Sequence, residues 1–150
     1  MGGKVPDQPA KKTSDAAARP DRFVRAREAQ ASALLEDYAE LIADLIAESG
    51  EARVADIAGR LGVAQPTATK AVARLQREGL AVSRPYRGVF LTEAGAALAE
   101  RVRARHRTVV DLLIAVGVPA ETAELDAEGL EHHVSERTLK AFEAYLARSR

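Results

Sequence analysis

Two short clusters of acidic residues and histidines have the residue types and the spacing of metal ligands. The run Glu128-Gly129-Leu130-Glu131-His132-His133 places two carboxylates and an imidazole at positions i, i+3 and i+4 of a helix. At about 3.6 residues per turn, Glu128, Glu131 and His132 project from one side, and His133 is rotated about 100° further round. This arrangement can supply half of a metal site. The alternative is a polar helix face that is simply solvated.

Two further groups upstream can complete such a site. Asp37 and Glu40 stand three residues apart in Glu36-Asp37-Tyr38-Ala39-Glu40, and His106 lies alone in an arginine-rich segment. Together the groups can form one site with six ligands: Asp37, Glu40, His106, Glu128, Glu131 and His132.

The chemistry of these side chains restricts the metal. Carboxylate oxygens with imidazole nitrogens, and no sulfur, suit Mn²⁺, Fe²⁺, Zn²⁺ or Co²⁺, and a site rich in carboxylates favours Mn²⁺. The four carboxylates would neutralise two divalent cations while the histidines stay neutral, so a binuclear site is electrostatically reasonable. Without metal the carboxylates repel one another, and the metal-free site should be loose or partly protonated. Metal binding can therefore act as a switch.

Composition favours a helical protein with a substantial core. The chain has 150 residues, of which 47% are hydrophobic and 4% aromatic, and this balance favours closely packed helices over a β-sandwich. The lack of cysteine excludes disulfides, thiolate zinc sites and cysteine nucleophiles. The sequence contains no apolar run of the roughly 18 residues that span a bilayer and no signal-peptide core. We therefore expect a soluble, cytoplasmic protein without membrane contact.

Charge is distributed unevenly along the chain, although the formal net charge is +0. Residues 64–90 contain five basic residues and one acidic residue, whereas residues 119–135 contain five acidic residues and no lysine or arginine. The basic middle region suits a polyanion, and the acidic C-terminal region suits cations.

The first part of the chain is interpreted as a tail followed by a long helix. Residues 1–30 are assigned as a disordered tail and helix lead-in, because three of the six prolines and little bulky apolar content fall there. The helix is expected to begin near Arg22 and to end at Ser49-Gly50. Its apolar positions recur at helical spacing: Leu34, Tyr38, Leu41 or Ile42, Leu45 and Ile46.

Residues 31–95 have the pattern of a winged helix-turn-helix domain. A short helix around Ile57 closes at Gly62, and a second helix opens on Pro66 and ends at Gly79. A short helix, a tight turn and a second helix form a helix-turn-helix.

Two short strands and a turn then indicate a wing. The predicted strands are Leu80–Arg84 and Val89–Thr92, joined across Pro85–Gly88. Glycine in this turn permits a positive φ, and the arginines of the segment would stand at its tip.

The second helix and the wing are the expected DNA contacts. In a helix-turn-helix, the first residues of the second helix meet base edges in the major groove. Glutamine can pair with adenine, lysine can reach guanine or phosphate, and the methyl groups of threonine and of Ala68 can touch thymine. Wing arginines suit the backbone or a narrow minor groove. The expected contacts are Gln65, Pro66, Thr67, Thr69, Lys70, Arg74, Arg84 and Arg87. A winged helix used only for protein contacts is the alternative.

Residues 96–150 are assigned to a helical metal-binding and dimerisation domain. Thr92 can cap a long helix that Gly117 stops, Pro119 begins an acidic helical segment, and Ser135 caps a last helix. The fold class is therefore mainly α. The apolar stripes exceed what one small domain needs, so we assign part of them to a two-fold homodimer interface: Val109, Leu112, Leu113, Val116, Leu139, Phe142 and Leu146.

Four motifs of this chain occur together: Glu36–Glu40, Tyr86–Thr92, Arg105-His106 and Asp126–Ser135. As a set they closely resemble the manganese-responsive regulators of the diphtheria-toxin-repressor family, from about residue 30 to the C-terminus. The resemblance implies a homodimeric repressor of manganese-uptake genes that binds double-stranded DNA. Carried over position by position, its metal ligands fall on the same six residues as above. The expected cofactor is Mn²⁺, two ions per subunit, with Fe²⁺, Co²⁺, Zn²⁺ or Cd²⁺ as substitutes.

Departures from the family pattern refine this expectation. The iron-responsive relatives have Met where Asp37 stands and Cys where Glu128 stands, so these positions point to manganese. The chain ends soon after the last helix and so is expected to lack their small C-terminal β-barrel. Its basic N-terminal tail is interpreted as disordered, with a weak DNA-contacting arm as the alternative. His133 is expected to be exposed or to contact a ligand.

A metal bound by the first helix and by the dimerisation helices would fix one against the other, and would set the orientation of the two DNA-reading helices in a dimer. The two-fold symmetry of such a dimer implies a palindromic operator. Three alternatives remain open at this stage. One is a regulator that responds to iron or another divalent metal, and the second is a metal-independent winged-helix regulator. A helical dinuclear metalloenzyme is disfavoured, because that architecture uses paired Glu-x-x-His motifs that this sequence lacks. We therefore do not expect an enzyme.

Overall fold

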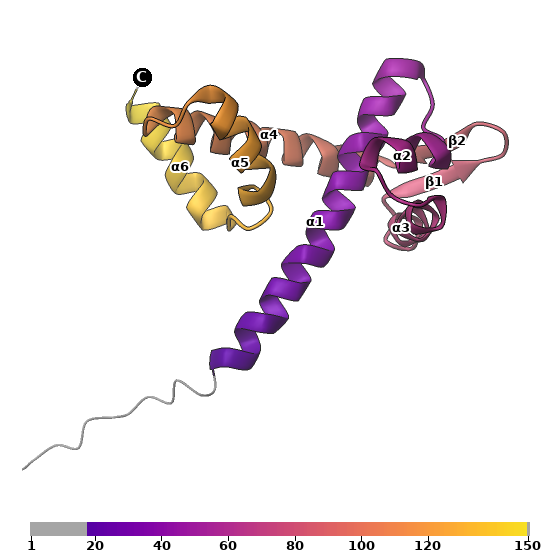
Figure 1. Ribbon diagram of the computed structural model, residues 1–150, viewed down its shortest axis with the longest axis horizontal. Coiled ribbons are helices and arrows are strands. Elements are labelled where there is room, and N and C mark those ends of the chain that lie inside the picture. Colours follow the sequence, from indigo (N-terminus) through magenta and orange to yellow (C-terminus); the bar gives the residue numbers. More distant parts are fainter. Residues whose placement is uncertain (1–17, 150) are drawn as a thin grey trace, which may run out of the picture.

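The computed structural model describes residues 18–149, which form a mainly α-helical fold with one small two-stranded sheet, as predicted (Figure 1). The long first helix begins at Ala18 rather than near Arg22. The predicted disordered tail otherwise lies outside the described residues. The elements are α1 (Ala18–Ser49), α2 (Val54–Leu61), α3 (Gln65–Arg77), β1 (Ala81–Arg84), β2 (Gly88–Leu91), α4 (Glu93–Ala115), α5 (Ala120–Leu130) and α6 (Glu136–Arg148).

The C-terminal half of α1 builds the core of the winged helix. It packs on α3 and β2 through one stripe of side chains, and α2 closes the same core (Figure 1). The predicted stripe was wrong by one residue at its start, because Leu34 is 45% exposed and Leu35 is buried. Leu35 is the residue at helical spacing from the other buried positions, and these are Tyr38, Ile42 and Leu45.

The wing is an antiparallel hairpin that is anchored to the loop after α1. Its register runs from Ala81 opposite Leu91 to Arg84 opposite Gly88. The backbone N–H of Val89 donates to the carbonyl of Ala52 at 2.7 Å. A Cβ at Gly88 would lie 2.5 Å from that same carbonyl oxygen, and its φ is +87°, so only glycine fits there.

Helix α4 is locked to the winged domain at its first turn. The Thr92 hydroxyl accepts from the Gly95 backbone N–H at 3.1 Å and donates to the Gly79 carbonyl at 2.6 Å, which confirms the predicted cap. A Cβ at Gly95 would lie 1.9 Å from the carbonyl oxygen of Leu80. This close approach fixes the direction in which α4 leaves the wing.

Helices α5 and α6 pack against the far half of α4, and α4 and α5 form a second, smaller core there (Figure 1). Ser135 caps α6 as predicted, accepting from the Thr138 N–H at 3.2 Å. Within the described residues, α6 has no fully buried side chain. Ile114, Val116 and Tyr145 are exposed apolar residues at this end of the molecule. No helix in the described part of the chain is long and apolar enough to cross a membrane.

Candidate metal centre

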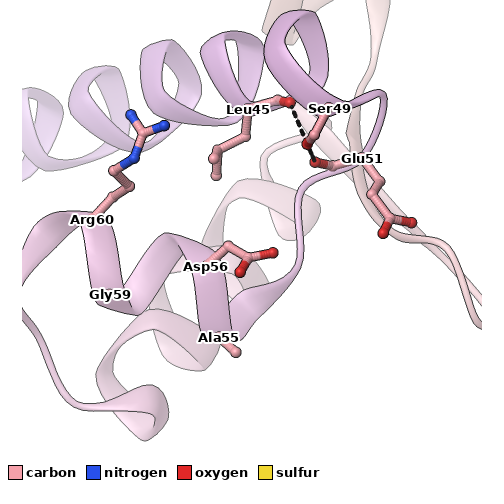
Figure 2. A pocket seen from close by; sticks show the side chains of 7 residues that line it. All are labelled: Leu45, Ser49, Glu51, Ala55, Asp56, Gly59 and Arg60. Carbon is pink, nitrogen blue, oxygen red and sulfur yellow. Dashed lines mark hydrogen bonds between the residues drawn. The ribbon is translucent and has the colours of Figure 1, made fainter.

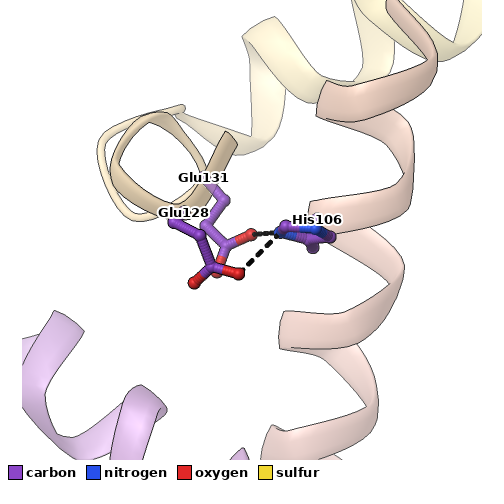
Figure 3. A group of neighbouring side chains, drawn as sticks. All are labelled: His106, Glu128 and Glu131. Carbon is purple, nitrogen blue, oxygen red and sulfur yellow. Dashed lines mark hydrogen bonds and ion pairs between the residues drawn. The ribbon is translucent and has the colours of Figure 1, made fainter. Parts of the chain in front are cut away.

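Helices α4 and α5 bring three of the predicted ligands together. One donor atom from each of His106, Glu128 and Glu131 lies within 4.8 Å of the others (Figure 3). The Nδ1 atom of His106 is 2.5 Å from a carboxylate oxygen of Glu131 and 4.0 Å from one of Glu128. An imidazole nitrogen and two carboxylates converging at this range can hold a divalent cation.

Glu131 is the centre of this group. It is 1% exposed, and it is the one fully buried charged residue in the part of the chain that the structure describes. Burial raises the pKa of Glu131 to about 7, against the lowering effect of His106 and His132. A carboxylate kept from water in this way gains more from a cation than a solvated one does.

His132 does not lie on the helix, as the spacing had predicted. Helix α5 ends at Leu130, and His132 stands in the turn that follows. Glu131 keeps helical backbone angles, φ −57° and ψ −33°, so the chain continues its path and the His132 ring still faces the cluster. Its Nε2 atom is 3.4 Å from an oxygen of Glu131.

The same nitrogen joins the cluster to α1. Nε2 of His132 lies 2.9 Å from Oδ1 of Asp37. This approach lacks hydrogen-bond geometry, and Nε2 is a buried polar atom without a hydrogen-bond partner. A buried nitrogen that faces two carboxylates and bonds to neither fits a ligand atom, and the donor set as a whole fits a hard divalent metal.

Glu40, the second predicted ligand on α1, is electrostatically part of the same site. Burial is the main cause of its raised pKa, and the negative charges of Asp44 and Glu128 add to it. Arg103 and His106 act in the opposite direction. Short contacts link the other five predicted ligands between α1, α4 and the end of α5, and Glu40 lies within electrostatic range of Glu128 and His106. His133 is exposed.

Three residues that contact the predicted ligands were not identified from the sequence. Glu36 accepts from Nδ1 of His132 at 2.7 Å and from Arg105 at 3.2 Å. Arg105 also donates to the backbone carbonyl of Glu131 at 3.3 Å. Glu124 lies 2.8 Å from Nε2 of His106. Glu36 and Arg105 adjoin predicted ligands in the sequence, but adjacency did not indicate these contacts.

The metal-free site is held together by protons and ion pairs. The carboxylates of Asp37 and Glu36 against its ring raise the pKa of His132 to about 10 despite burial. Burial lowers the pKa of His106, but Glu124 and Glu131 outweigh it and the net shift is upward. Burial likewise raises the pKa of Glu36, but His132 and Arg105 outweigh it and leave the pKa lowered. A metal must therefore displace protons from the histidines.

The predicted DNA-binding residues lie on α3 and the wing. Most of the α3 side chains are exposed, and a shallow hollow there is lined by Gln65, Pro66, Thr69 and Lys70. The predicted thymine contact by Ala68 is wrong, because its methyl group is fully buried in the core. The helical period turns this position inward while its neighbours on either side face solvent.

The arginines in this region differ in their contacts with other side chains. Arg74 is paired at 3.3 Å with Glu78, the residue that follows the last residue of α3. The guanidinium of Arg84 lies 4.8 Å from the ring centre of Phe90. Arg87 is exposed at the turn of the wing, beside Tyr86, which is 97% exposed and has a φ of +63°.

A second hollow lies between α1 and α2, away from these ligands. Figure 2 shows its lining, where the Ser49 hydroxyl donates to the carbonyl of Leu45 at 2.9 Å. Arg60 on its rim forms an ion pair with Glu48. The hollow contains no predicted ligand or DNA contact, and we assign it no role in the site.

Comparison with known protein families matches both halves of the chain. The family described as "Iron dependent repressor, N-terminal DNA binding domain" matches residues 31–89. The family described as "Iron dependent repressor, metal binding and dimerisation domain" matches residues 92–150.

Individual proteins give the same result. The transcriptional regulator MntR of Escherichia coli O157:H7 is 53% identical over 123 residues, which cover 82% of this chain and 79% of the relative. The HTH-type transcriptional regulator MntR of Lysinibacillus sphaericus (strain C3-41) is 43% identical over 67% of this chain and 73% of its own length.

Solved structures agree in fold. The manganese regulator SloR and ScaR with bound Zn²⁺ each align with a TM-score of 0.66 and 28% identity. Each alignment covers 75% of this chain and 53% of the solved chain, so this chain spans about half the length of those two proteins.

Proposed function

The chain belongs to the iron-dependent repressor family of transcriptional regulators, and on this premise we propose that it is a Mn²⁺-dependent repressor of manganese-uptake genes. One observation supports this most strongly. Asp37 on α1 faces the buried Nε2 of His132, beside Glu131, in a cluster that also contains His106. The role is regulatory rather than catalytic, in keeping with the family.

The proposed ligands come from both regions of the chain. Asp37 and Glu40 lie on α1, whereas His106, Glu128, Glu131 and His132 lie on α4 and at the end of α5. When bound, a divalent metal would supply positive charge that offsets the repulsion among the four carboxylates. Helix α3 is the proposed recognition helix, and α1 packs on it. Ligands that hold α1 against α4 therefore also restrict the position of α3. Metal binding at this site would therefore affect the position of the DNA-binding surface on α3.

The protein is proposed to act as a homodimer on a palindromic operator. The matched dimerisation domain and the exposed Ile114, Val116 and Tyr145 support a two-fold interface at the α4–α6 end. Two recognition helices related by a two-fold axis read two half-sites of opposite direction. The proposed DNA contacts are Gln65, Pro66, Thr67, Thr69, Lys70, Arg74, Arg84 and Arg87.

Manganese is proposed over iron, with two ions per subunit, from the donor chemistry. All proposed donors are carboxylate oxygens or imidazole nitrogens, without sulfur, and this set suits Mn²⁺. The names of similar proteins also support the choice, since SloR is a manganese regulator and another solved relative is a manganese-dependent repressor in complex with manganese. Fe²⁺, Co²⁺, Zn²⁺ and Cd²⁺ are the proposed substitutes.

Equilibrium titration of DNA binding with and without Mn²⁺ tests this function. We expect Mn²⁺ to tighten operator binding by about 1 to 3 kcal/mol relative to the chelated protein, roughly 5- to 150-fold. Fluorescence anisotropy of a labelled operator measures both affinities under the same salt. Equal affinity in chelator and in excess Mn²⁺ would refute the metal switch and favour a metal-independent winged-helix regulator.

A second prediction separates the roles of the wing and the recognition helix. Arg87→Ala should weaken binding to every DNA sequence about equally and lower the salt slope by about one, because an exposed wing arginine contacts phosphate. Gln65→Ala should instead cost about 1 to 3 kcal/mol on the operator alone, because a base contact is lost.

Binding isotherms at several salt concentrations, on operator and on unrelated DNA, distinguish the two effects. Glu51→Ala is the control, because this half-buried residue lies in the loop after α1, pairs with Arg53 and is outside the proposed DNA contacts. An unchanged salt slope in Arg87→Ala would mean that the wing does not touch phosphate.

A further inference from the structure

Glu36 forms a hydrogen bond with Nδ1 of the His132 ring, the nitrogen that faces away from Asp37 and Glu131. Its Oε2 atom lies 2.7 Å from Nδ1 of His132. Both side chains are largely buried, with exposures of 13% for Glu36 and 6% for His132. The partners are 96 residues apart in the chain, so the contact also joins α1 to the turn after α5. A buried hydrogen bond of this kind permits few orientations of the ring.

Arg105 donates hydrogen bonds to both carboxylate oxygens of Glu36. Its Nη1 atom lies 3.4 Å from Oε1 and 3.2 Å from Oε2 of Glu36. The same nitrogen donates to the backbone carbonyl of Glu131. The guanidinium therefore balances the charge of Glu36, whose two oxygens are engaged by Arg105 and His132. Glu36 is placed to act through His132 rather than on a cation directly.

We propose that Glu36 is a positioning residue that retains the Nδ1–H of His132, so that Nε2 is the nitrogen presented to the metal. This inference rests on the proposed function, because it takes His132 as a ligand. A carboxylate bonded to the outer N–H of a ligating histidine fixes its tautomer and its ring orientation, and raises its basicity. The orphaned Nε2 beside Asp37 and Glu131 is the atom that this arrangement leaves for coordination.

The His106 ring faces the cluster through Nδ1 instead of Nε2, and its supporting carboxylate is more exposed than Glu36. Its Nε2 faces Glu124, whereas its Nδ1 faces Glu131 and Glu128. Glu124 is 61% exposed, so water competes for its contact with His106. Glu36 is shielded from that competition, and its loss should have the larger effect on metal affinity.

Two variants test the proposal in the full-length protein. Glu36→Ala removes the acceptor and should weaken Mn²⁺ binding by roughly 10- to 100-fold, the usual effect of losing such a support. Glu36→Gln keeps an oxygen that can accept from Nδ1–H, and should lose distinctly less affinity than Glu36→Ala. The matched controls are Glu48→Ala and Glu48→Gln, since Glu48 is on the same helix but pairs with Arg60 at the surface. Free Mn²⁺ measured by electron paramagnetic resonance gives the affinities.

A second readout reports the ring itself. The protein has three histidines, so ¹⁵N-labelled histidine gives a spectrum simple enough to assign. In the Cd²⁺-loaded wild type, Nε2 of His132 should couple to cadmium and Nδ1 should carry the proton. Glu36→Gln should keep this pattern, and Glu36→Ala should lose it, while thermal unfolding checks that each variant is folded.

The outcomes separate this inference from the proposed function. The positioning role is overturned if Glu36→Ala binds Mn²⁺ within twofold of the wild-type affinity. It is also overturned if cadmium couples to Nδ1 of wild-type His132. Either result leaves the proposed ligand set intact. Cadmium binding without coupling to either nitrogen of His132 overturns the ligand assignment and this inference together. If Glu36→Ala does not fold, the positioning role is tested by the wild-type spectrum and by the Mn²⁺ affinity of Glu36→Gln relative to Glu48→Gln.

Discussion

Replacement of Glu131 by glutamine is expected to abolish the tightening of operator binding by Mn²⁺. Glu131 is buried and lies 2.5 Å from Nδ1 of His106 and 3.4 Å from Nε2 of His132, so it faces both proposed histidine ligands. The amide is nearly the same size but carries no charge. A site that loses the charge of its buried carboxylate, one of four negative charges, no longer offsets the cost of desolvating a divalent cation.

The measurement is the ratio of operator affinities in Mn²⁺ and in chelator. We expect the roughly 5- to 150-fold ratio of the wild type to fall close to one in Glu131→Gln. Glu121→Gln is the matched control, because this exposed residue lies in the first turn of α5, the helix that ends just before Glu131, and it should retain the full ratio. Retention of a wild-type ratio in a folded Glu131→Gln protein would show that Glu131 is not a ligand.

Replacement of Asp37 by methionine should change which metal activates the protein. Asp37 lies 2.9 Å from Nε2 of His132 and, at 47% exposure, has room for a longer side chain. The exchange replaces a charged oxygen donor with a neutral, soft thioether. Affinity generally rises from Mn²⁺ through Fe²⁺ to Co²⁺, so loss of one hard donor should harm the response to Mn²⁺ most.

Activation curves for DNA binding with Mn²⁺, Co²⁺ and, without oxygen, Fe²⁺ test this selectivity. His106→Ala is the informative comparison, because loss of an imidazole should weaken the response to all three metals alike. If Asp37→Met responds to Mn²⁺ and Fe²⁺ in the wild-type ratio, then Asp37 does not select the metal. The choice of manganese over iron would then lose its main chemical support.

The helices and the wing were predictable because their signals are local. Thr92 and Ser135 cap α4 and α6 as predicted, and Gly62 ends α2 with a φ of +67°. Each of these features depends on backbone groups within a few residues, so the sequence alone carries the information. Errors arose where the pattern had two solutions. Leu34 and Leu35 fit almost the same helical stripe, and only the packing of the core buries Leu35 rather than Leu34.

The residue types and the grouping of the candidate ligands were evident from the sequence. Hard oxygen and nitrogen donors at helical spacing indicated a divalent metal, and a basic helix followed by a wing indicated DNA. Residue spacing misplaced His132 on the helix and missed Glu36 and Glu124 as partners of the histidines. The spacing rule assumes a continuous helix, whereas α5 ends at Leu130.

The nitrogen of each histidine that faces the cluster could not be predicted from residue spacing. That choice depends on Glu36 reaching His132 across 96 residues and on Arg105 reaching Glu36 across 69 residues. Contacts at such separations arise from the way α1 crosses α4, and this crossing is set by the burial of the α1 stripe and by the close approach of Gly95 to Leu80. Periodicity places side chains around a single helix, but the orientation of one helix against another follows from the packing of the whole core.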